Sequence, residues 1–331
     1  MIRGAPVIVP RTRASTLRPA IVDRRSSVAD PITSYRASPI DADILRIPVG
    51  PGALHVERYG HGGRPIVLLH GFGTSSFLWR AVGPALAVGG CTAFAADLLG
   101  HGESDRPFDA GFGIAAQAEY LDRALTALRV ARATVVGVDL GGTVALRLAA
   151  TRPDRVERLV LINPRLLDSV PGADIRAMQR NTARVALRIS RGVLGATALL
   201  APLLEGAVSD PAHMPPRLVA RYLAPFVGRE GVGHLLALAR AIREEEIESV
   251  RLEGVRAPTL VIWGTADRWL DQRIPEHLAE GIPRSRLLTL PDVGRLVPEE
   301  SPDQLSSLLL EFVGVEAPAA GRGVVAGTPP R

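Results

Sequence analysis

The sequence predicts an α/β protein built on a mostly parallel central sheet, with helices on both faces of the sheet and a helical cap inserted between two late strands. Two observations lead to this prediction. Short apolar runs alternate along the chain with stretches of helical period, and such runs are typical of parallel strands buried on both faces. One long interval, residues 165–253, breaks the alternation and contains helical patterns but no strand pattern.

The strands and helices expected from these patterns follow one another in a regular order. Two strands, at residues 44–49 and 53–59, open the core. A helix with an apolar stripe is expected at residues 114–129, and another helix directly after Gly142. The remaining strands are continuous apolar runs that lead into loops, within residues 64–73, 91–107, 133–139, 156–164, 257–267 and 285–294.

The interval from residue 165 to residue 253 is expected to form a cap, or lid. It holds four helical patterns, at residues 174–189, 191–207, 216–227 and 231–247. The interval begins where a strand ends, and ligands bind at this edge of open α/β sheets. A cap over a small-molecule site is therefore the favoured interpretation, and a helical packing subdomain is the alternative.

Both ends of the chain lie outside the expected core, which comprises residues 41–164 and 254–314. Residues 1–40 contain seven Arg and two Asp, a local charge of +5 that equals the net charge of all 331 residues. The rest of the chain therefore carries no net charge, and nucleic-acid binding by the folded part is not expected. Residues 1–40 and 315–331 are expected to be disordered, and a transit-like or partner-binding role of the basic arm stays open.

The composition excludes several classes of function. All 39 basic residues are Arg, so the chain lacks the lysine that a phosphate-binding P-loop or Schiff-base chemistry needs. Cys91 is the single cysteine and no H-E-x-x-H motif is present, so neither a metal nor a cofactor is expected. No apolar run has the length of a membrane span, and no secretory signal precedes the core. We expect a soluble, cytoplasmic protein without a membrane partner.

The segment from Gly137 to Gly141 has the sequence G-V-D-L-G and stands between a strand and a helix. This is the pattern of a nucleophile elbow, in which glycines flank a reactive side chain because strand and helix crowd the backbone. The reactive position holds Asp139. The turn also places the Leu140 N–H at a helix N-terminus, where it can face a developing oxyanion.

Four motifs together resemble the α/β-hydrolase superfamily. They are "LLHGFG" (68–73), "DLLGHGESDRP" (97–107), "VGVDLGG" (136–142) and "WGTADRW" (263–269), and the resemblance covers about residues 50–314. It implies that the Phe72 N–H is the second oxyanion donor and that Asp267 is the triad acid. An Asp at the elbow is similar to the epoxide hydrolase and haloalkane dehalogenase branch, whose carboxylate attacks carbon and forms an ester. The resemblance thus implies that Asp139 is a covalent nucleophile.

Three positions depart from the pattern of that branch. Arg295, in "VGRLVPEE", stands where the family has its catalytic histidine, and a guanidinium cannot accept a proton near neutral pH. Leu140 stands where dehalogenases have a halide-binding Trp, and Tyr222 is the single tyrosine of the cap where epoxide hydrolases have two. In the family geometry Arg295 lies between Asp139 and Asp267, and we predict that it hydrogen-bonds both carboxylates.

The expected ligand is a small hydrophobic molecule beneath the cap, in a pocket to which His70, Tyr222 and His234 contribute. Three hypotheses remain open for what the protein does with it. Asp139 attacks the ligand as a covalent nucleophile, or the pocket folds or dehydrates a reactive intermediate without hydrolysis. In the third, the chain binds its ligand without catalysis and Asp139, Arg295 and Asp267 form a charge cluster. The oligomeric state is not predicted.

Overall fold

The computed structural model describes residues 7–9, 41–180, 194–248 and 250–314. Within this part of the chain, one sheet has the strand order β1-β2-β3-β5-β4-β6-β7-β8-β9. The first four strands in that order pair antiparallel, and those from β5 to β9 pair parallel. The strands are β1 (Val7–Val9), β2 (Asp43–Pro48), β3 (Ala53–Tyr59), β4 (Pro65–Leu69), β5 (Thr92–Ala96), β6 (Ala133–Val138), β7 (Val156–Ile162), β8 (Thr259–Gly264) and β9 (Ser285–Leu290).

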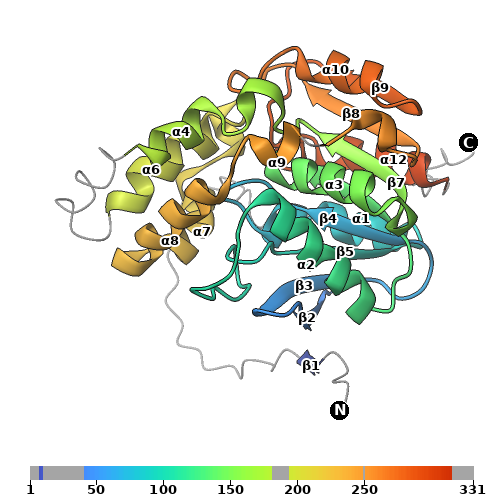
Figure 1. Ribbon diagram of the computed structural model, residues 1–331, viewed down its shortest axis with the longest axis horizontal. Helices are drawn as coiled ribbons and strands as arrows, with labels where there is room; N and C mark the ends of the chain where they lie inside the picture. Colours follow the sequence, from blue (N-terminus) through green and yellow to red (C-terminus); the bar gives the residue numbers. More distant parts are fainter. Residues whose placement is uncertain (1–6, 10–40, 181–193, 249, 315–331) are drawn as a thin grey trace, which may run out of the picture.

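Helices cover both faces of this sheet (Figure 1). On one face α2 packs against α3, which also lies on β6 and β7, and on the other α1 packs against α12. The helix α10 covers β8 and β9. The bounds of these helices are α1 (Val82–Val88), α2 (Ile114–Ala127), α3 (Leu140–Thr151), α10 (Ile274–Gly281), α11 (Val297–Glu300) and α12 (Pro302–Val313), with the 3-10 turns η1 (Ser76–Trp79), η2 (Pro153–Arg155) and η6 (Leu252–Gly254).

Three of the parallel strands are buried along their whole length, as their unbroken apolar sequences predict. Every residue of β5, β6 and β8 is buried. Strands covered on both faces need apolar side chains at successive positions rather than at alternate ones. The predicted fold class, a mostly parallel sheet between layers of helices, is confirmed.

The chain between β7 and β8 contains helices and 3-10 turns in its described residues, and these gather beyond one end of the sheet (Figure 1). The helices α4 and α6 each pack against α8, and α6 also packs against α7. Residues 181–193 lie outside the described residues, so the predicted helix at 174–189 is described only in its first part, as α4. The elements are η3 (Leu167–Ser169), α4 (Ala173–Gln179), α6 (Leu194–Glu205), η4 (Pro211–His213), α7 (Pro216–Leu223), η5 (Ala224–Phe226), α8 (Gly228–Ala241) and α9 (Glu245–Glu248).

One strand was not expected. Val7–Val9 falls within the segment predicted to be disordered, yet it pairs antiparallel with β2, with Val7 opposite Arg46 and Val9 opposite Ile44. Three β-branched residues in a row favour extended backbone, and an edge strand offers main-chain groups for such pairing. Residues 1–6, 10–40 and 315–331 lie outside the described residues. Among the helices that are described, none combines the length and apolar character needed to cross a bilayer.

Candidate functional site

The turn between β6 and α3 has the geometry of a nucleophile elbow. Asp139 links the two elements with φ 53° and ψ −120°, a backbone conformation that L-residues rarely adopt. A side chain at Gly137 would collide with the backbone of Gly141, and one at Gly141 would collide with the carbonyl of His70. Both positions therefore require glycine, which explains the G-x-D-x-G sequence.

Both carboxylate oxygens of Asp139 are engaged. Oδ2 accepts a hydrogen bond of 2.9 Å from the backbone N–H of Phe72, the donor that the family resemblance implies. Oδ1 accepts a hydrogen bond of 3.2 Å from Nη1 of Arg295. The same Oδ1 lies 2.7 Å from Nε of Arg165, in an ion pair that does not meet the alignment of a hydrogen bond. Asp139 is buried, with 2% of its surface exposed.

Arg295 lies between Asp139 and Asp267, as predicted. Its Nε is 3.3 Å from Oδ2 of Asp267, and its Nη2 is 3.5 Å from Oδ1. Asp267 follows β8 and is held by the backbone N–H of Trp269 at 2.9 Å and by Nδ2 of Asn163 at 3.2 Å. The loops after two neighbouring parallel strands therefore bring Arg295 and Asp267 to the carboxyl edge of the sheet, beside the elbow.

Two further members of the site are not predicted from the sequence. Arg165, three residues past the end of β7, forms a bidentate pair with Asp174, with Nη1–Oδ1 at 2.9 Å and Nη2–Oδ2 at 2.6 Å. Asp174 stands in the first turn of α4, and its Oδ2 is 3.7 Å from Nη1 of Arg295. The signal for Arg165 is its place after a strand next to the elbow strand, at the sheet edge where site residues gather.

We call Asp139, Arg165, Asp174, Asp267 and Arg295 the Asp–Arg cluster. Each is buried, and with all groups ionised the three carboxylates and two guanidiniums sum to −1. Burial disfavours the charged form of Asp174, but Arg165, Arg295 and the Ile175 N–H together outweigh it and hold the pKa of this carboxyl well below its usual range. Burial also opposes the charge of Arg165, yet the flanking carboxylates, led by Asp139, raise its pKa. The bidentate pair of Arg165 and Asp174 is thus held in its ionised form.

No group of three or more His, Cys, Asp or Glu side chains suited to a metal ion occurs among the described residues. The three carboxylates of the Asp–Arg cluster are instead separated by guanidiniums. The cluster has the donor and acceptor composition of an ion-pair network rather than of a metal centre.

The side chains predicted to line a substrate pocket make their described hydrogen bonds outside the cluster. His70 accepts from the backbone N–H of Leu98 at 3.0 Å through Nε2 and contacts the Gly71 carbonyl at 2.8 Å through Nδ1. Burial lowers the pKa of His70, so it is a neutral support of the Gly71–Phe72 loop. Leu140 is buried at the start of α3.

Tyr222 and His234 connect the core to the helical segment between β7 and β8. We call the described residues of this segment, from η3 to α9, the cap for short, and its role as a lid stays a prediction. The Tyr222 hydroxyl donates to Oε1 of Glu299, whose carboxylate also receives a bidentate pair from Arg80 at 2.7 and 2.6 Å. Nε2 of His234 lies 2.6 Å from the Gly100 carbonyl. Tyr222 thus fastens α7 to α11, and His234 fastens α8 to the loop after β5.

The cap is also hydrogen-bonded to two of the loops that supply the Asp–Arg cluster, those that carry Asp267 and Arg295. Nε1 of Trp269 donates to the Gly206 carbonyl at 2.9 Å, and the backbone N–H of Leu296 donates to the Ala207 carbonyl at 3.1 Å. Trp269 is two residues after Asp267, and Leu296 directly follows Arg295. The turn after α6 is therefore joined to the two loops that carry Asp267 and Arg295.

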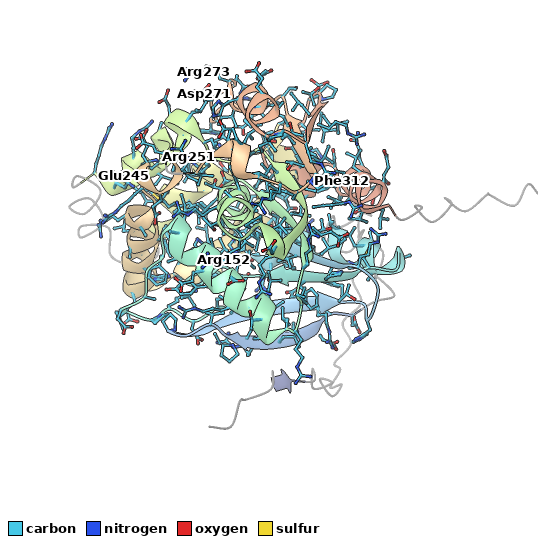
Figure 2. All side chains as sticks on the ribbon, turned by 45° about the vertical axis from the view of Figure 1, so that its right-hand side comes forward. Arg152, Glu245, Arg251, Asp271, Arg273 and Phe312 are labelled. Atoms are coloured by element: carbon cyan, nitrogen blue, oxygen red, sulfur yellow. The ribbon has the colours of Figure 1, made fainter. Side chains whose placement is uncertain are left out.

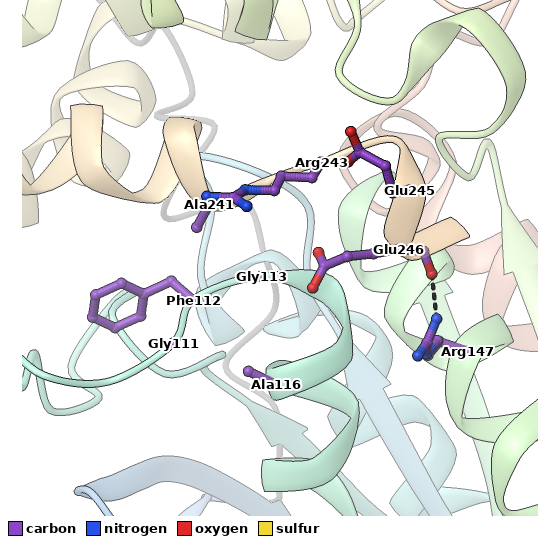
Figure 3. A pocket seen from close by; sticks show the side chains of 9 residues that line it. All are labelled: Gly111, Phe112, Gly113, Ala116, Arg147, Ala241, Arg243, Glu245 and Glu246. Atoms are coloured by element: carbon purple, nitrogen blue, oxygen red, sulfur yellow. Dashed lines mark hydrogen bonds between the residues drawn. The ribbon is translucent and has the colours of Figure 1, made fainter. Parts of the chain in front are cut away.

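An open pocket of about 600 Å³ lies where the cap meets the core on another side (Figure 3). Charged side chains of Glu246 and Arg147 line one end of it, and Phe112 lines the other (Figure 3). The Glu246 carboxylate accepts from the backbone N–H of Ile114 at 2.8 Å, at the N-terminus of α2. This pocket does not include any member of the Asp–Arg cluster.

Comparison with known families agrees with this architecture. Residues 64–302 match the family model described as the alpha/beta hydrolase fold. The chain belongs to the α/β-hydrolase family. The match spans the sheet from β4 to β9, the elbow, the cap and the loop that carries Arg295.

Curated relatives and solved structures extend the comparison. The chain is 31% identical over 261 residues to a dihydrolipoyllysine-residue acetyltransferase component of an acetoin cleaving system from Pseudomonas putida, a match that covers 78% of this chain and 65% of that protein. It is 31% identical to a haloalkane dehalogenase from Mycobacterium marinum, over 76% of this chain and 84% of that one. The crystal structure of Cfl2 from Burkholderia cenocepacia has a TM-score of 0.72 at 25% identity, with 82% of this chain and 96% of that chain covered.

Proposed function

We propose that this α/β-hydrolase binds a small, predominantly apolar molecule beneath its cap and does not hydrolyse it through the elbow. In this proposal Asp139 serves as a structural anion of the Asp–Arg cluster. The chain is then a non-hydrolytic member of its family.

The observation that carries the proposal is the engagement of both Asp139 oxygens. In a carboxylate nucleophile one oxygen faces the oxyanion donors while the other attacks. Here Oδ2 faces the Phe72 N–H, so Oδ1 is the oxygen left to attack. Oδ1 is paired with Arg165 and Arg295, which stabilise its charge and occupy its approach. Among the described residues, the side chains that pair with the carboxylates and guanidiniums of the cluster are its own Asp and Arg members and Asn163, with no histidine. Arg295, which holds the histidine position, cannot take up a proton.

The nature of the ligand is argued from the cap. The helix α6 has the apolar sequence LGATALLAPLLE, and its Leu200 packs so closely on Gly73 that a side chain there would collide with it. Apolar side chains of the cap therefore face the loop of the oxyanion donor. One relative, the dehalogenase from Mycobacterium marinum, is named for haloalkanes, which supports a small apolar ligand.

A second candidate function is covalent catalysis by Asp139. The strained elbow at φ 53° and the Phe72 N–H bonded to Oδ2 favour it, because both are the arrangement that an attacking carboxylate needs. In that case, without a base to activate water, the ester intermediate would accumulate.

Intact-mass spectrometry and a binding assay together distinguish the two functions. The wild-type protein and Asp139→Asn are each incubated with styrene oxide and with 1-bromohexane, and thermal unfolding is then recorded with the unreactive ligands ethylbenzene and 2-phenylethanol. We expect no covalent adduct on either protein, no product above background, and a rise in melting temperature with at least one unreactive ligand.

An adduct that forms on the wild type and not on Asp139→Asn would overturn the proposal in favour of the nucleophile. Absence of both adduct and stabilisation across the ligands would overturn the proposed ligand class. Arg295→His is a further arm of the same assay. It is expected to remain without turnover, because Arg165 still pairs with Asp139 Oδ1.

A further inference from the structure

His101 is a buried imidazole whose two ring nitrogens make no hydrogen bond of standard geometry to the described residues. It lies in the loop after β5, between Gly100 and Gly102, with 1% of its surface exposed. Neither Nδ1 nor Nε2 is hydrogen-bonded within the described chain. Each ring nitrogen of a neutral imidazole is a donor or an acceptor, so two polar atoms are left without partners.

His101 lies next to the loop after β4, which donates a hydrogen bond to Asp139 at the elbow. Its ring centroid is 5.2 Å from that of His70 and 6.1 Å from that of Phe72. Phe72 is the residue whose N–H donates to Asp139. His70 cannot supply a partner, since both of its ring nitrogens are already used by Leu98 and Gly71. His101 therefore stands beside the functional site with free hydrogen-bonding capacity.

Helix α8 of the cap contacts the turn that carries His101. His234 of α8 contacts the Gly100 carbonyl, and the rings of His234 and Phe112 meet edge to face at 5.3 Å. The Phe112 ring also packs on Gly100, where a side chain would approach it to 2.9 Å. Phe112 also lines the open pocket of Figure 3, so the same side chain contacts both that pocket and the turn that carries His101.

A buried polar group without a partner is costly, and proteins rarely leave one in that state. We propose that His101 is the polar anchor of the ligand site, and that its partner is the hydroxyl group of a neutral alcohol with an apolar body. This inference rests on the proposed ligand-binding function and names the chemical class of the ligand.

The choice of an alcohol follows from charge and from hydrogen-bonding capacity. Burial lowers the pKa of His101 well below its usual value, His70 and His234 lower it further, and the Leu99 backbone acts in the opposite direction without reversing the shift. A neutral imidazole offers no counter-charge to a carboxylate or an amine. A hydroxyl both donates and accepts, so it pairs with either tautomer of His101, whereas a hydrocarbon pairs with neither.

Long-range ¹H–¹⁵N spectra of the full chain labelled with ¹⁵N-histidine test this directly. The probes are two alcohols, 2-phenylethanol and cyclohexanol, and their hydrocarbon counterparts, ethylbenzene and methylcyclohexane. We expect the alcohols to shift one ring nitrogen of His101 and the hydrocarbons to leave both unchanged. The exposed His61 is the internal control, and its signals are expected to stay constant in all four titrations.

His101→Phe provides the matched variant, since it keeps an aromatic ring and removes both nitrogens. We expect it to weaken binding of the alcohols by about 5- to 10-fold and to leave hydrocarbon affinity unchanged. Absence of any alcohol-dependent shift of the His101 ring nitrogens overturns the inference. If alcohols and hydrocarbons bind equally well, the inference fails while the proposed function stands. If neither class stabilises the protein, the proposed function fails as well.

Discussion

At the scale of single residues, the meaning of Asp139 depends on what surrounds it. The elbow backbone and the Phe72 donor are those of an attacking carboxylate. Arg165 and Arg295 convert the same group into one member of a buried ion-pair network. Ion pairs of this kind are strongly interdependent, because removal of one partner leaves an uncompensated charge in a low-dielectric interior.

Arg165→Leu is expected to destabilise the protein by about 3–5 kcal/mol, because it leaves Asp174 buried without its bidentate partner. The double variant Arg165→Leu/Asp174→Leu is expected to be more stable than the single variant, since both charges leave together. Urea denaturation followed by circular dichroism measures these differences. The control is Arg273→Leu, at an exposed arginine on the surface (Figure 2) that pairs with Asp168 and Asp271. Its unfolding midpoint is expected to change little, and an equal loss in both single variants would contradict a special role of the cluster.

The sequence predicts three of the five members of the cluster. Asp139, Asp267 and Arg295 each follow a strand within a recognisable motif, and parallel strands bring such loops to one edge. Arg165 also follows a strand, but no motif marks it. Asp174 belongs to the cap, and nothing in a linear pattern indicates how a cap helix is oriented on the sheet. The roles expected for His70, Tyr222 and His234 in the pocket stay predictions, and their described contacts are those of support and fastening.

At the scale of elements, the elbow requires glycines because strand β6, helix α3 and the loop after β4 meet within a few ångströms. A side chain at Gly141 would collide with the carbonyls of His70 and Leu69. These are backbone atoms of a buried strand end, so they cannot move aside as a flexible side chain does.

Gly141→Ala is accordingly expected to lower the free energy of unfolding by about 1–3 kcal/mol or more. The matched control is Gly233→Ala on α8, where nothing lies within 4 Å of the added methyl group. That exchange in an exposed helix position is expected to stabilise by up to about 1 kcal/mol. Thermal and urea unfolding of both variants give the comparison. Equal stability of the two would show that the elbow is looser than its geometry implies.

At the scale of the whole molecule, the order of strands and the helical interval between β7 and β8 follow from hydrophobic patterning. The fastening of the cap does not, because it depends on pairs far apart in sequence, such as Tyr222 with Glu299 and Trp269 with Gly206. The sequence pattern does not predict the strand Val7–Val9, for a related reason. Three residues are too few to show a period, and their pairing depends on an edge that only the folded sheet provides.

The stability of the protein is expected to fall as the pH drops below about 6.5. Burial lowers the pKa of His70 and of His101, so the unfolded chain binds protons at these sites first, near the ordinary histidine pKa of about 6.5. The free energy of unfolding then decreases by up to about 1.4 kcal/mol per pH unit for each histidine. Urea denaturation between pH 7.5 and pH 5 measures this slope.

Two substitutions, measured in the same urea experiment, separate the contributions of individual histidines to this slope. His101→Phe is expected to reduce the slope, and His277→Phe, at an exposed position, is expected to keep the wild-type slope. Asp174 adds nothing to it in this window. Its pKa is lowered in the folded protein, so its stabilisation is fully present above the unfolded pKa of about 4 and is lost only as the pH falls below that value. A wild-type slope in His101→Phe would contradict a buried neutral His101.

The bidentate pair between Arg165 and Asp174 has an evolutionary consequence. A route of single substitutions from this site to a hydrolytic triad must replace Arg295 by a base and also release Asp139 from Arg165. Replacing Arg165 alone leaves Asp174 without its partner, and replacing Asp174 alone leaves Arg165 held to Asp139 more firmly. Each of these single steps breaks a buried ion pair, and we expect it to lower stability. We therefore expect substitutions within the cluster to be strongly non-additive, so that paired changes cost less stability than single ones.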